Sequence, residues 1–360
     1  MRILVPFFLM ITLLHAGPLG FASLDGGTDG GGDRKPVLVK TAEELRSAVE
    51  RLDQPKERRD STPRVIRLSG DIDLGELANE KSGKVLTKVG VIRPRSHTTL
   101  EGPPGGATLR GGTIELKGVE NLIIRNLRFR DLWEEDPSGE YDEMGWDYIR
   151  ISSAGKKGSR RVWVDHCDFG KVYDGQLDII HGSDLVTISH CILSGGGQTQ
   201  KKGMLIGNSS SENARAQDKG HLNVTIHDCW FKELSSRAPR LRHGNLHFFN
   251  NLVEHVGTAT ISVCGAATLV EGCVYRDCKV AVSNSHADDS KENNRGGITR
   301  VVDSLSLGKK PGPMADDNTG FRFNSVGGFE WNDPLKLPYP YQAKPAAEVE
   351  VSIQRDAGPK

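Results

Sequence analysis

The chain has 360 residues with 47 basic and 47 acidic side chains, so its formal net charge at pH 7 is zero. This balance excludes a protein drawn to nucleic acid or to a membrane surface by its overall charge, and any electrostatic function must come from local clusters. Glycine accounts for 42 residues and aromatic side chains for only 6% of the chain, which is typical of a chain with many tight turns and few bulky core residues.

The N-terminal segment has the layout of a secretory signal. Arg2 precedes an apolar run over residues 3–14, and small residues lead up to Ala22. The run is shorter than the roughly 20 apolar residues that span a bilayer. We therefore predict a signal peptide over residues 1–22 and export to the periplasm or the medium. Residues 23–36 are expected to form a flexible linker, and residues 37–360 a single domain.

Residues 41–52 carry the pattern of a short amphipathic helix. Thr41 and Glu44 can form a capping box, and Leu45 and Val49 lie on one face of the expected helix. Such a helix can cover the open end of the repeating structure that follows it, since a stack of repeats needs capped ends.

A repeat runs through the middle of the chain. Six eight-residue segments alternate apolar and polar residues, and their sixth positions are Leu127, Cys167, Cys191, Cys229, Asn251 and Cys273. The intervals are 40, 24, 38, 22 and 22 residues, as if loops were inserted into coils of fixed length. Second strands share the period, for example at 148–152 and 177–180. Because helical patterns and hairpin turn signals are scarce between the strands, we predict an all-β, single-stranded parallel β-helix. The charged tail from about Asp333 should pack outside it.

Four of the six cysteines occupy the same repeat position. In stacked coils they form a ladder with rungs about 4.8 Å apart, and parallel side chains do not approach as a disulfide requires. We expect these thiols to be buried and reduced, with Cys264 and Cys278 as the pair closer to a disulfide. The His166–Cys167 and His190–Cys191 pairs invite a zinc site, but repetition at the coil period is what stacking alone produces.

Three aspartates lie at the start of consecutive second strands. Asp147 precedes the strand at 148–152, and Asp174 and Asp178 lie around the equivalent strand one coil later. In a parallel stack these three carboxylates converge on one outer face. Convergent carboxylates need a raised pKa, a basic partner or a hard cation. Oxygen-only ligands fit calcium, while the alternative is a set of ordinary surface aspartates.

Basic residues occupy the next two coils. Lys202 begins one coil, and the stretch SSRAPRLRHG brings Arg237, Arg240 and Arg242 to the following one. Solvated arginines around a turn proline are the simpler interpretation. The layered order of acids, lysine and arginines instead suits an acidic polymer whose carboxylates are bridged by calcium and bound by guanidinium groups.

Several strings resemble the hallmark motifs of the pectate lyase family, whose fold is a right-handed parallel β-helix: VWVDHCDF, DGQLDIIHGSDLVTIS, KKGMLIGNSSS, VTIHDCWF and RAPRLRHGNLHFFNN. The resemblance covers roughly residues 37–278. It implies calcium as cofactor and polygalacturonate as substrate, with calcium-binding acids at Asp147, Asp174 and Asp178. It further implies substrate contacts at Lys202 and Arg242 and a proton-abstracting arginine at Arg237. We place Arg240 with the substrate-binding group.

Two positions depart from the family pattern. Some members have a further acid where this chain has Gly145, which puts the number of calcium ligands from the protein in doubt. The repeat position often filled by asparagine carries cysteine here. The related pectin lyases, which prefer the methyl ester, lack the calcium acids, so retention of all three favours the de-esterified substrate.

The resemblance implies β-elimination, in which the proton at C5 of a galacturonate unit is removed and the bond to O4 breaks. Like charges around Arg237 disfavour its protonated form and make an arginine base reasonable. A hydrolase on the same fold would use Asp174 and Asp178 as paired acid and base, which leaves the arginine segment without a role. A catalytically silent β-helix that binds polysaccharide is the other alternative. We expect a monomer.

Overall fold

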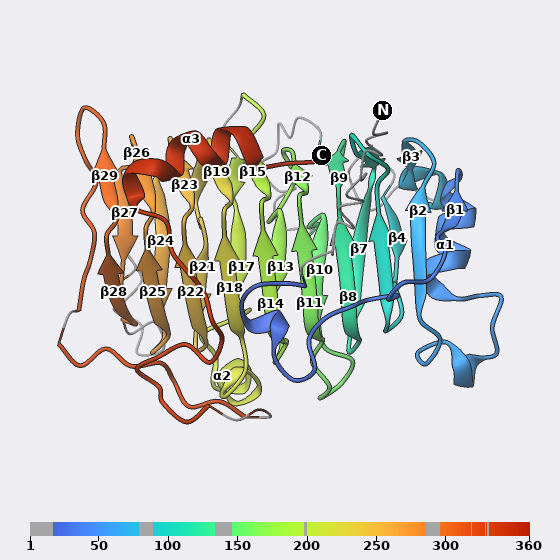
Figure 1. The fold of residues 1–360 in the computed structure, drawn as a ribbon, viewed down its shortest axis with the longest axis horizontal. Helices are drawn as coiled ribbons and strands as arrows, with labels where there is room; N and C mark the ends of the chain where they lie inside the picture. Colours follow the sequence, from blue (N-terminus) through green and yellow to red (C-terminus); the bar gives the residue numbers. More distant parts are fainter. Residues whose placement is uncertain are drawn as a thin grey trace, which may run out of the picture.

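The computed structural model describes residues 17–78, 89–133, 146–197, 200–285, 296–317, 319–327, 329 and 331–360. A complete coil contributes one strand to each of three parallel sheets, here named A, B and C, and the coils stack along the long axis in Figure 1. The chain forms a right-handed parallel β-helix, as the sequence predicts. None of the helices in this described part is long and apolar enough to cross a membrane.

Sheet A has ten strands, in the order β1 (Val37–Val39), β2 (Arg64–Leu68), β5 (Thr98–Glu101), β8 (Glu120–Arg125), β11 (Arg160–Asp165), β14 (Asp184–Ser189), β18 (Asn223–His227), β22 (Asn245–Phe249), β25 (Ala267–Glu271) and β28 (Ile298–Val302). Sheet B has nine, namely β3 (Ile72–Asp73), β6 (Ala107–Arg110), β9 (Leu127–Arg130), β12 (Asp168–Phe169), β15 (Ile192–Ser194), β19 (Trp230–Lys232), β23 (Leu252–Glu254), β26 (Val274–Arg276) and β29 (Leu305–Leu307).

Sheet C carries the predicted site. Its strands are β4 (Gly90–Ile92), β7 (Gly112–Lys117), β10 (Ile149–Ser152), β13 (Leu177–Ile179), β17 (Met204–Ile206), β21 (Arg240–Arg242), β24 (Thr258–Val263) and β27 (Val280–Ser283), with β16 (Gln200–Lys202) and β20 (Leu234–Ser236) pairing beside them.

The core is a set of stacks of identical or similar side chains. In sheet C, Ile149 pairs with Leu177 and Leu177 with Met204, and all three are fully buried. In sheet B, the rings of Phe129 and Phe169 stack with centroids 4.8 Å apart. Because strands alternate sides with a period of two, the residues between these buried positions must point outward. The stacking that fills the core therefore also aligns the outward side chains.

The cysteine ladder is confirmed. The backbone N–H groups of Cys167 and Cys191 donate to the Sγ atoms of Cys191 and Cys229, each at 3.4 Å, and Cys229 N–H donates to Asn251 Oδ1 at 2.9 Å. Cysteine therefore performs the same task as asparagine at this turn. It accepts a backbone hydrogen bond from the preceding coil while the thiol stays reduced and buried.

The predicted pairing of Cys264 with Cys278 is wrong, because both thiols are free. Cys278 precedes β27, whereas Cys264 follows β24, its neighbour in the sheet. Residue 258, at the start of β24, pairs with residue 280. The two cysteines consequently lie at opposite ends of adjacent strands, roughly 16 Å or more apart at about 3.3 Å per residue, and a disulfide cannot bridge that distance.

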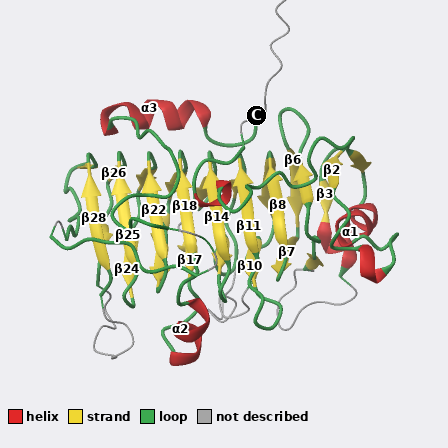
Figure 2. Ribbon diagram, turned by 60° about the horizontal axis from the view of Figure 1, so that its bottom comes forward, coloured by secondary structure: helices red, strands yellow, loops and turns green. Residues whose placement is uncertain are grey.

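The first coil is covered by α1 (Ala42–Glu50), at the blue end of the stack in Figure 1 and drawn as a red helix at the same end in Figure 2. The side chain of Thr41 caps the helix by accepting from Glu44 N–H, and Leu45 and Val49 are buried. Two further helices, α2 (Glu212–Asp218) and α3 (Ala346–Asp356), were not expected from the sequence. The first stands in an inserted loop, and the second packs on sheet B against Leu252 and Val274.

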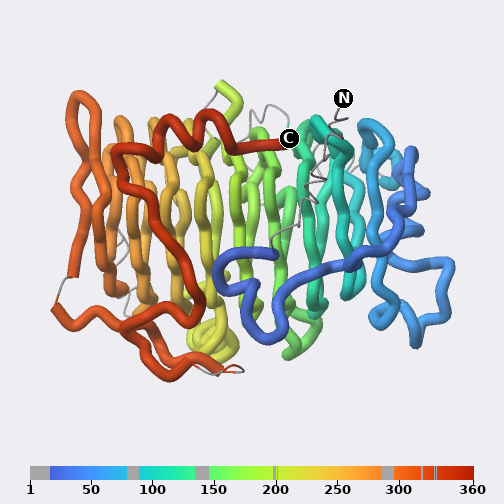
Figure 3. The backbone as a smooth tube through the Cα atoms, viewed as in Figure 1, coloured from blue at the N-terminus to red at the C-terminus, as the bar shows by residue number. Residues whose placement is uncertain are grey.

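Part of the segment predicted as a flexible linker, residues 23–36, is fixed to the stack together with the residues just before it. Figure 3 shows the N-terminal segment crossing the side of the stack, and it is hydrogen-bonded there. The N–H of Phe21 donates to Thr225 Oγ1 at 3.0 Å, and the N–H of Gly30 donates to Asn121 Oδ1 at 2.8 Å. Gly30 has a φ of 57°, and a Cβ there would lie 2.3 Å from Thr99 Oγ1. Glycine thus permits close packing here rather than disorder.

Candidate active site on sheet C

The turns that lead into successive sheet C strands lie directly on one another. The N–H of Asp174 donates to Trp146 O at 3.3 Å, just before β13 and β10. Two coils further on, Met204 N–H donates to Arg237 O at 2.7 Å. Asp147, Asp174, Lys202 and Arg237 therefore stand at the entrances of consecutive strands, which are neighbours in Figure 1.

A second file of outward side chains runs across the middle of these strands. Arg150 pairs with Asp178, Asp178 with Leu205, and Leu205 with Arg240. At about 4.8 Å per strand, Asp178 and Arg240 are two rungs or about 9.6 Å apart along the sheet. Arg242 follows two residues later on the same face of β21. All seven predicted site residues thus lie on sheet C or in the turns that enter it.

Two of the carboxylates meet over Gly175. Asp147 Oδ1 accepts the N–H of Gly175 at 2.9 Å. A Cβ placed on Gly175 would lie 2.6 Å from Asp178 Oδ1 and 3.1 Å from Asp147 Oδ1. The absence of a side chain at this position therefore allows both carboxylate oxygens to approach the same point.

Two of the three aspartates, Asp147 and Asp174, each contact a cationic side chain. Asp174 Oδ1 lies 2.7 Å from Lys202 Nζ, and Asp147 Oδ2 lies 2.7 Å from Arg150 Nη2. By contrast, Asp178 Oδ1 is buried and receives no hydrogen bond from any residue in the described part of the chain. An orphaned buried carboxylate oxygen is costly unless another group binds it.

Comparison with known proteins identifies the family. The family model described as pectate lyase matches residues 7–358. The chain belongs to the pectate lyase family. It is 32% identical over 282 residues to pectate lyase A of Emericella nidulans, which covers 76% of this chain and 73% of that protein. The protein is therefore a polysaccharide lyase, and β-elimination on pectate is the reaction expected of it.

Solved pectate lyases share the fold. The pectate lyase of Paenibacillus sp. 0602 matches with a TM-score of 0.74 and 24% identity, over 95% of this chain and 96% of that one. A pectate lyase from Bacillus sp. N165, solved in complex with trigalacturonate, matches with a TM-score of 0.65 and 21% identity, over 95% of this chain and 98% of that one. These likenesses confirm the β-helix predicted from the repeats.

The acids of this pectate lyase family member repel one another. Burial, and then the charge of Asp174, raises the pKa of Asp147 to about 7, although Arg150 opposes the change. Burial raises the pKa of Asp178 well above its usual value, with further contributions from Asp147 and Asp174, while Arg150 and Arg237 oppose it. Both acids would bind a proton readily in the absence of a cation, so the arrangement favours any cation that can replace that proton.

The arginines extend this charged surface. Arg237 has a φ of 67°, a left-handed conformation that is uncommon for residues with a side chain, and its N–H donates to Thr258 O at 3.1 Å. Arg242 Nη1 donates to Gly207 O at 2.8 Å. Burial lowers the pKa of Arg242, Cys264 opposes this change, and the charge of Arg237 adds to it. The charge of Arg237 acts on both Asp178 and Arg242.

Two residues of the site, Arg150 and Gly175, were not predicted from the sequence. Arg150 neutralises Asp147, and its outward position in the strand YIRIS, on the same rung as Asp178, was the available signal. Gly175 carries no signal beyond its place directly after Asp174. The departure noted at Gly145 lies outside the described residues.

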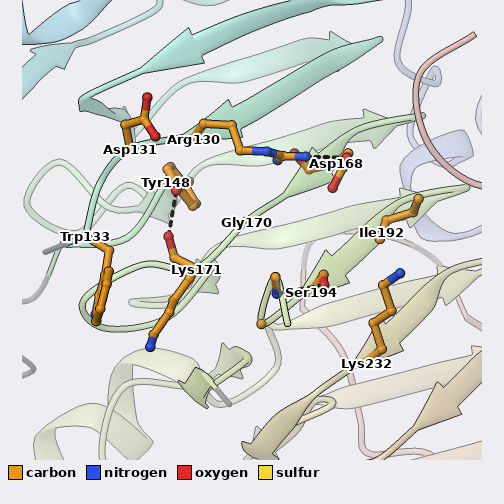
Figure 4. A pocket seen from close by; sticks show the side chains of 12 residues that line it. Arg130, Asp131, Trp133, Tyr148, Asp168, Gly170, Lys171, Ile192, Ser194 and Lys232 are labelled. Atoms are coloured by element: carbon orange, nitrogen blue, oxygen red, sulfur yellow. Dashed lines mark hydrogen bonds and ion pairs between the residues drawn. The ribbon is translucent and has the colours of Figure 1, made fainter. Parts of the chain in front are cut away.

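A separate cavity of about 490 Å³ lies at the ends of the sheet B strands (Figure 4). Arg130 and Asp168 form an ion pair in its wall, and Lys171 Nζ lies 3.9 Å from the ring centroid of Trp133. Tyr148, the residue after Asp147, donates through its hydroxyl to Lys171 O at 2.7 Å. The predicted site residues do not line this cavity. They lie on the sheet C side of the same turns.

Proposed function

We propose that this protein is a calcium-dependent pectate lyase that cleaves de-esterified polygalacturonate and releases unsaturated oligogalacturonides. The convergence of Asp147 and Asp178 over Gly175, with Arg237 at the entrance of a strand in the same sheet, carries this proposal. The substrate class is supported by the related fold that was solved in complex with trigalacturonate. It is also supported by the row of cations next to the acids.

Calcium fits the residues that are present. Asp147, Asp174 and Asp178 supply oxygen atoms only, which is the ligand type calcium prefers. Asp178 Oδ1 is buried without a hydrogen bond from the described residues, so a ligand position is open. When bound, calcium would neutralise these acids and stabilise negative charge that develops on a substrate carboxylate.

Arg237 is the proposed base. Its guanidine, when neutral, takes the proton from C5 of a galacturonate unit. The electron pair released at C5 forms the double bond to C4, and the bond from C4 to the glycosidic oxygen breaks with its electron pair passing to that oxygen. Backbone hydrogen bonds to Thr258 and from Met204 hold Arg237 in place, so little reorganisation is needed before the proton transfer.

Lys202, Arg240 and Arg242 are the proposed substrate-binding groups. Arg242 is oriented by hydrogen bonds to the carbonyl oxygens of Gly207 and Asn208, at 2.8 and 3.2 Å. A guanidinium fixed in this way can bind a carboxylate with less loss of side-chain entropy. In the same way Lys202, held by Asp174 at 2.7 Å, can exchange that partner for a carboxylate of the substrate.

One assay tests the proposal. Purified protein is incubated with polygalacturonate in calcium and then in chelator, while ultraviolet absorbance of the unsaturated product is followed beside new reducing ends. A calcium-dependent lyase produces both signals and loses both in chelator. Reducing ends without absorbance would show hydrolysis instead, and neither signal would show a protein that only binds polysaccharide.

Export is a second part of the proposal. It rests on the N-terminal sequence, in which Arg2 precedes the apolar run of residues 3–14. The structure gives a reason to place the cleavage site earlier than Ala22, because Phe21 and Ala22 are fully buried in the fold. We further propose that the exported domain acts as a monomer, which sedimentation of the purified protein can test.

A further inference from the structure

A cluster of one aspartate and two histidines lies at the edge of sheet A, away from the sheet C acids. Asp165 ends β11, His166 follows it, and His190 follows β14 in the next coil. Both histidines are in the left-handed backbone conformation, with φ of 48° and 50°. This conformation turns the imidazoles outward, while Cys167 and Cys191, the residues after them, point into the core.

The three side chains already converge. His166 Nδ1 lies 2.7 Å from Asp165 Oδ2, and His190 Nδ1 lies 3.1 Å from Asp165 Oδ1. The two imidazoles stack with centroids 4.5 Å apart and an interplanar angle of 7°. One nitrogen from each ring and one carboxylate oxygen lie within 4.8 Å of one another.

The three side chains are near enough to share one ion after they turn toward it. Ligand atoms at about 2.0–2.1 Å from a tetrahedral zinc ion lie roughly 3.3 Å from one another. Here the two Nδ1 atoms contact different oxygens of Asp165, at 2.7 and 3.1 Å, and the candidate ligand atoms lie within 4.8 Å of one another. Metal binding would replace the two hydrogen bonds to Asp165 with bonds from the same Nδ1 atoms.

A carboxylate lies near the second ring nitrogen of His190. Histidine ligands usually donate that N–H to a carboxylate, but His190 Nε2 lies 4.0 Å from Asp228 Oδ2, beyond hydrogen-bond distance, and this oxygen contacts His227 Nδ1 at 2.8 Å. Asp228 is itself held by Lys344 Nζ at 2.6 Å. Ser189 Oγ donates to Asp165 Oδ1 at 2.6 Å and so orients the carboxylate.

The cluster can be reached from solvent. Asp165 and His166 line a cavity of about 500 Å³ that leads to solvent, and His166 and His190 side chains are 26% and 31% exposed. A metal can therefore reach these side chains, and water can complete its coordination.

We propose that Asp165, His166 and His190 form a binding site for Zn²⁺ that links two adjacent coils. Two imidazoles and one carboxylate suit zinc. The neighbouring thiols take no part, because Cys167 and Cys191 are fully buried in the core and their Sγ atoms contact backbone carbonyl oxygens. The site is separate from the oxygen-only acids on sheet C, so its existence does not depend on the proposed lyase function.

Calorimetry with zinc chloride tests the site. The untagged full-length protein, treated with chelator and desalted, is titrated in a calcium-containing buffer so that the sheet C acids are occupied. We expect one zinc ion per chain. His166→Gln and His190→Gln should each weaken binding by at least about tenfold, and His221→Gln, which removes a histidine beside a single carboxylate at 3.9 Å, should leave it unchanged.

Cobalt gives a second readout that depends on the ligands themselves. Co²⁺ in the wild-type site should give the visible absorption of a low-coordinate nitrogen and oxygen complex, and zinc should displace it. Both histidine variants should fold and keep their activity on polygalacturonate, because neither residue touches the sheet C site. If wild-type protein shows no saturable zinc binding, or if the histidine variants bind zinc as well as wild type, the cluster is only a hydrogen-bonded network and the proposal is wrong.

Discussion

Sheets A and C are built from the same coils, yet their outward faces have become different kinds of surface. On sheet C the outward file carries charged side chains such as Asp178, which lacks a hydrogen bond on Oδ1 from the described residues. On sheet A the outward file is covered by both ends of the chain, and Thr225 and His247 bind the hydroxyl of Tyr339 at 2.8 and 2.9 Å. Stacking supplies an aligned row of side chains in both cases. A row that another segment of the chain covers serves to hold that segment, whereas an uncovered row is available to bind a ligand.

The two faces also differ in how protons affect them. On sheet C, burial and neighbouring acids raise the pKa of Asp147 to about 7. On sheet A, hydrogen bonds from two histidines lower the pKa of Asp165 despite its burial. The acids on sheet C repel one another until a cation binds, whereas the carboxylate of Asp165 on sheet A already has hydrogen-bond donors from the protein. Changes on the two faces should therefore have opposite effects.

The largest expected effect is on catalysis at sheet C. Replacing the proposed base in Arg237→Ala should reduce kcat by about 10²–10⁴-fold, the usual contribution of a general base, with the fold and substrate binding retained. Arg215→Ala, on the exposed face of α2, is the matched control and should keep normal activity. Absorbance of the unsaturated product gives kcat, and circular dichroism checks the fold. Near-normal turnover by Arg237→Ala would exclude it as the base.

A large effect on stability is expected where the chain ends cover sheet A. Phe21 is fully buried, with its ring centroid 5.6 Å from that of Trp331 and 5.2 Å from that of Tyr339. Phe21→Ala should lower the free energy of unfolding by about 3 kcal/mol, while Leu335→Ala, at a site 65% exposed, should change it little.

The same contacts predict that the exported protein retains Phe21, and intact mass of the secreted chain checks this. Cleavage after Ala22 would contradict the prediction, and Phe21→Ala would then leave the stability of the secreted protein unchanged. Such cleavage would show that the part of sheet A that Phe21 covers can be left exposed.

A smaller effect of opposite sign is expected for the sheet C acids. In chelator at pH 8, Asp178→Asn should raise the free energy of unfolding by about 1–3 kcal/mol, because it removes a buried charge that lacks compensation. The folded pKa of Asp178 is raised, so the wild-type acid favours the folded state at low pH. This contribution to stability is lost as the pH rises from the pKa of Asp178 in the unfolded chain, near 3.8, through its raised pKa in the folded protein.

The advantage of Asp178→Asn should therefore shrink as the pH falls from 8 to 5. In calcium the order should reverse, since only the wild-type carboxylate binds the ion strongly. Thermal unfolding at both pH values, with and without calcium, measures all of these differences. A variant less stable than wild type at pH 8 in chelator would show that the acids are not under repulsion.

The smallest effect is expected at the ion pair that ties the C-terminal tail to sheet A. Lys344 Nζ lies 2.6 Å from Asp228 Oδ1, but its side chain is 42% exposed. Pairs of this kind contribute up to about 1 kcal/mol, so Lys344→Ala should lower the melting temperature by at most about 2 °C. Lys336→Ala, with a side chain 82% exposed, is the control and should have no measurable effect.

Periodic features were predictable because each coil repeats the contacts of the previous one. The register of Val162 with Val186 and of Val186 with Val224 follows from equal positions in the repeat, and the cysteine ladder follows from the same rule. The grouping of Asp147, Asp174 and Asp178 was also predictable, since it needs only the coil period and the alternation of strand faces.

Features that break the period were not predictable. Neither Cys264 nor Cys278 belongs to the cysteine ladder, which suggested that they pair with each other. In the fold they lie at opposite ends of neighbouring strands. Gly175 is one of many glycines, and only the approach of two carboxylate oxygens shows why it has no side chain. His166 and Cys167 are adjacent in the sequence, but their side chains point to opposite sides of the fold. The imidazole lies beside Asp165 and the thiol lies in the core.

By itself, the sequence determined that this chain stacks into a β-helix and that acids and bases of successive coils share one face, because contacts between coils recur at a fixed spacing. Tertiary structure alone decided which outward rows are covered. The glycine-rich stretch at residues 26–32 has the composition of a free linker, yet Asn121 and Thr99 accept its backbone N–H groups and hold it on sheet A. Those acceptors lie about 70 to 90 residues away in the chain. A local sequence pattern cannot predict contacts over such a separation.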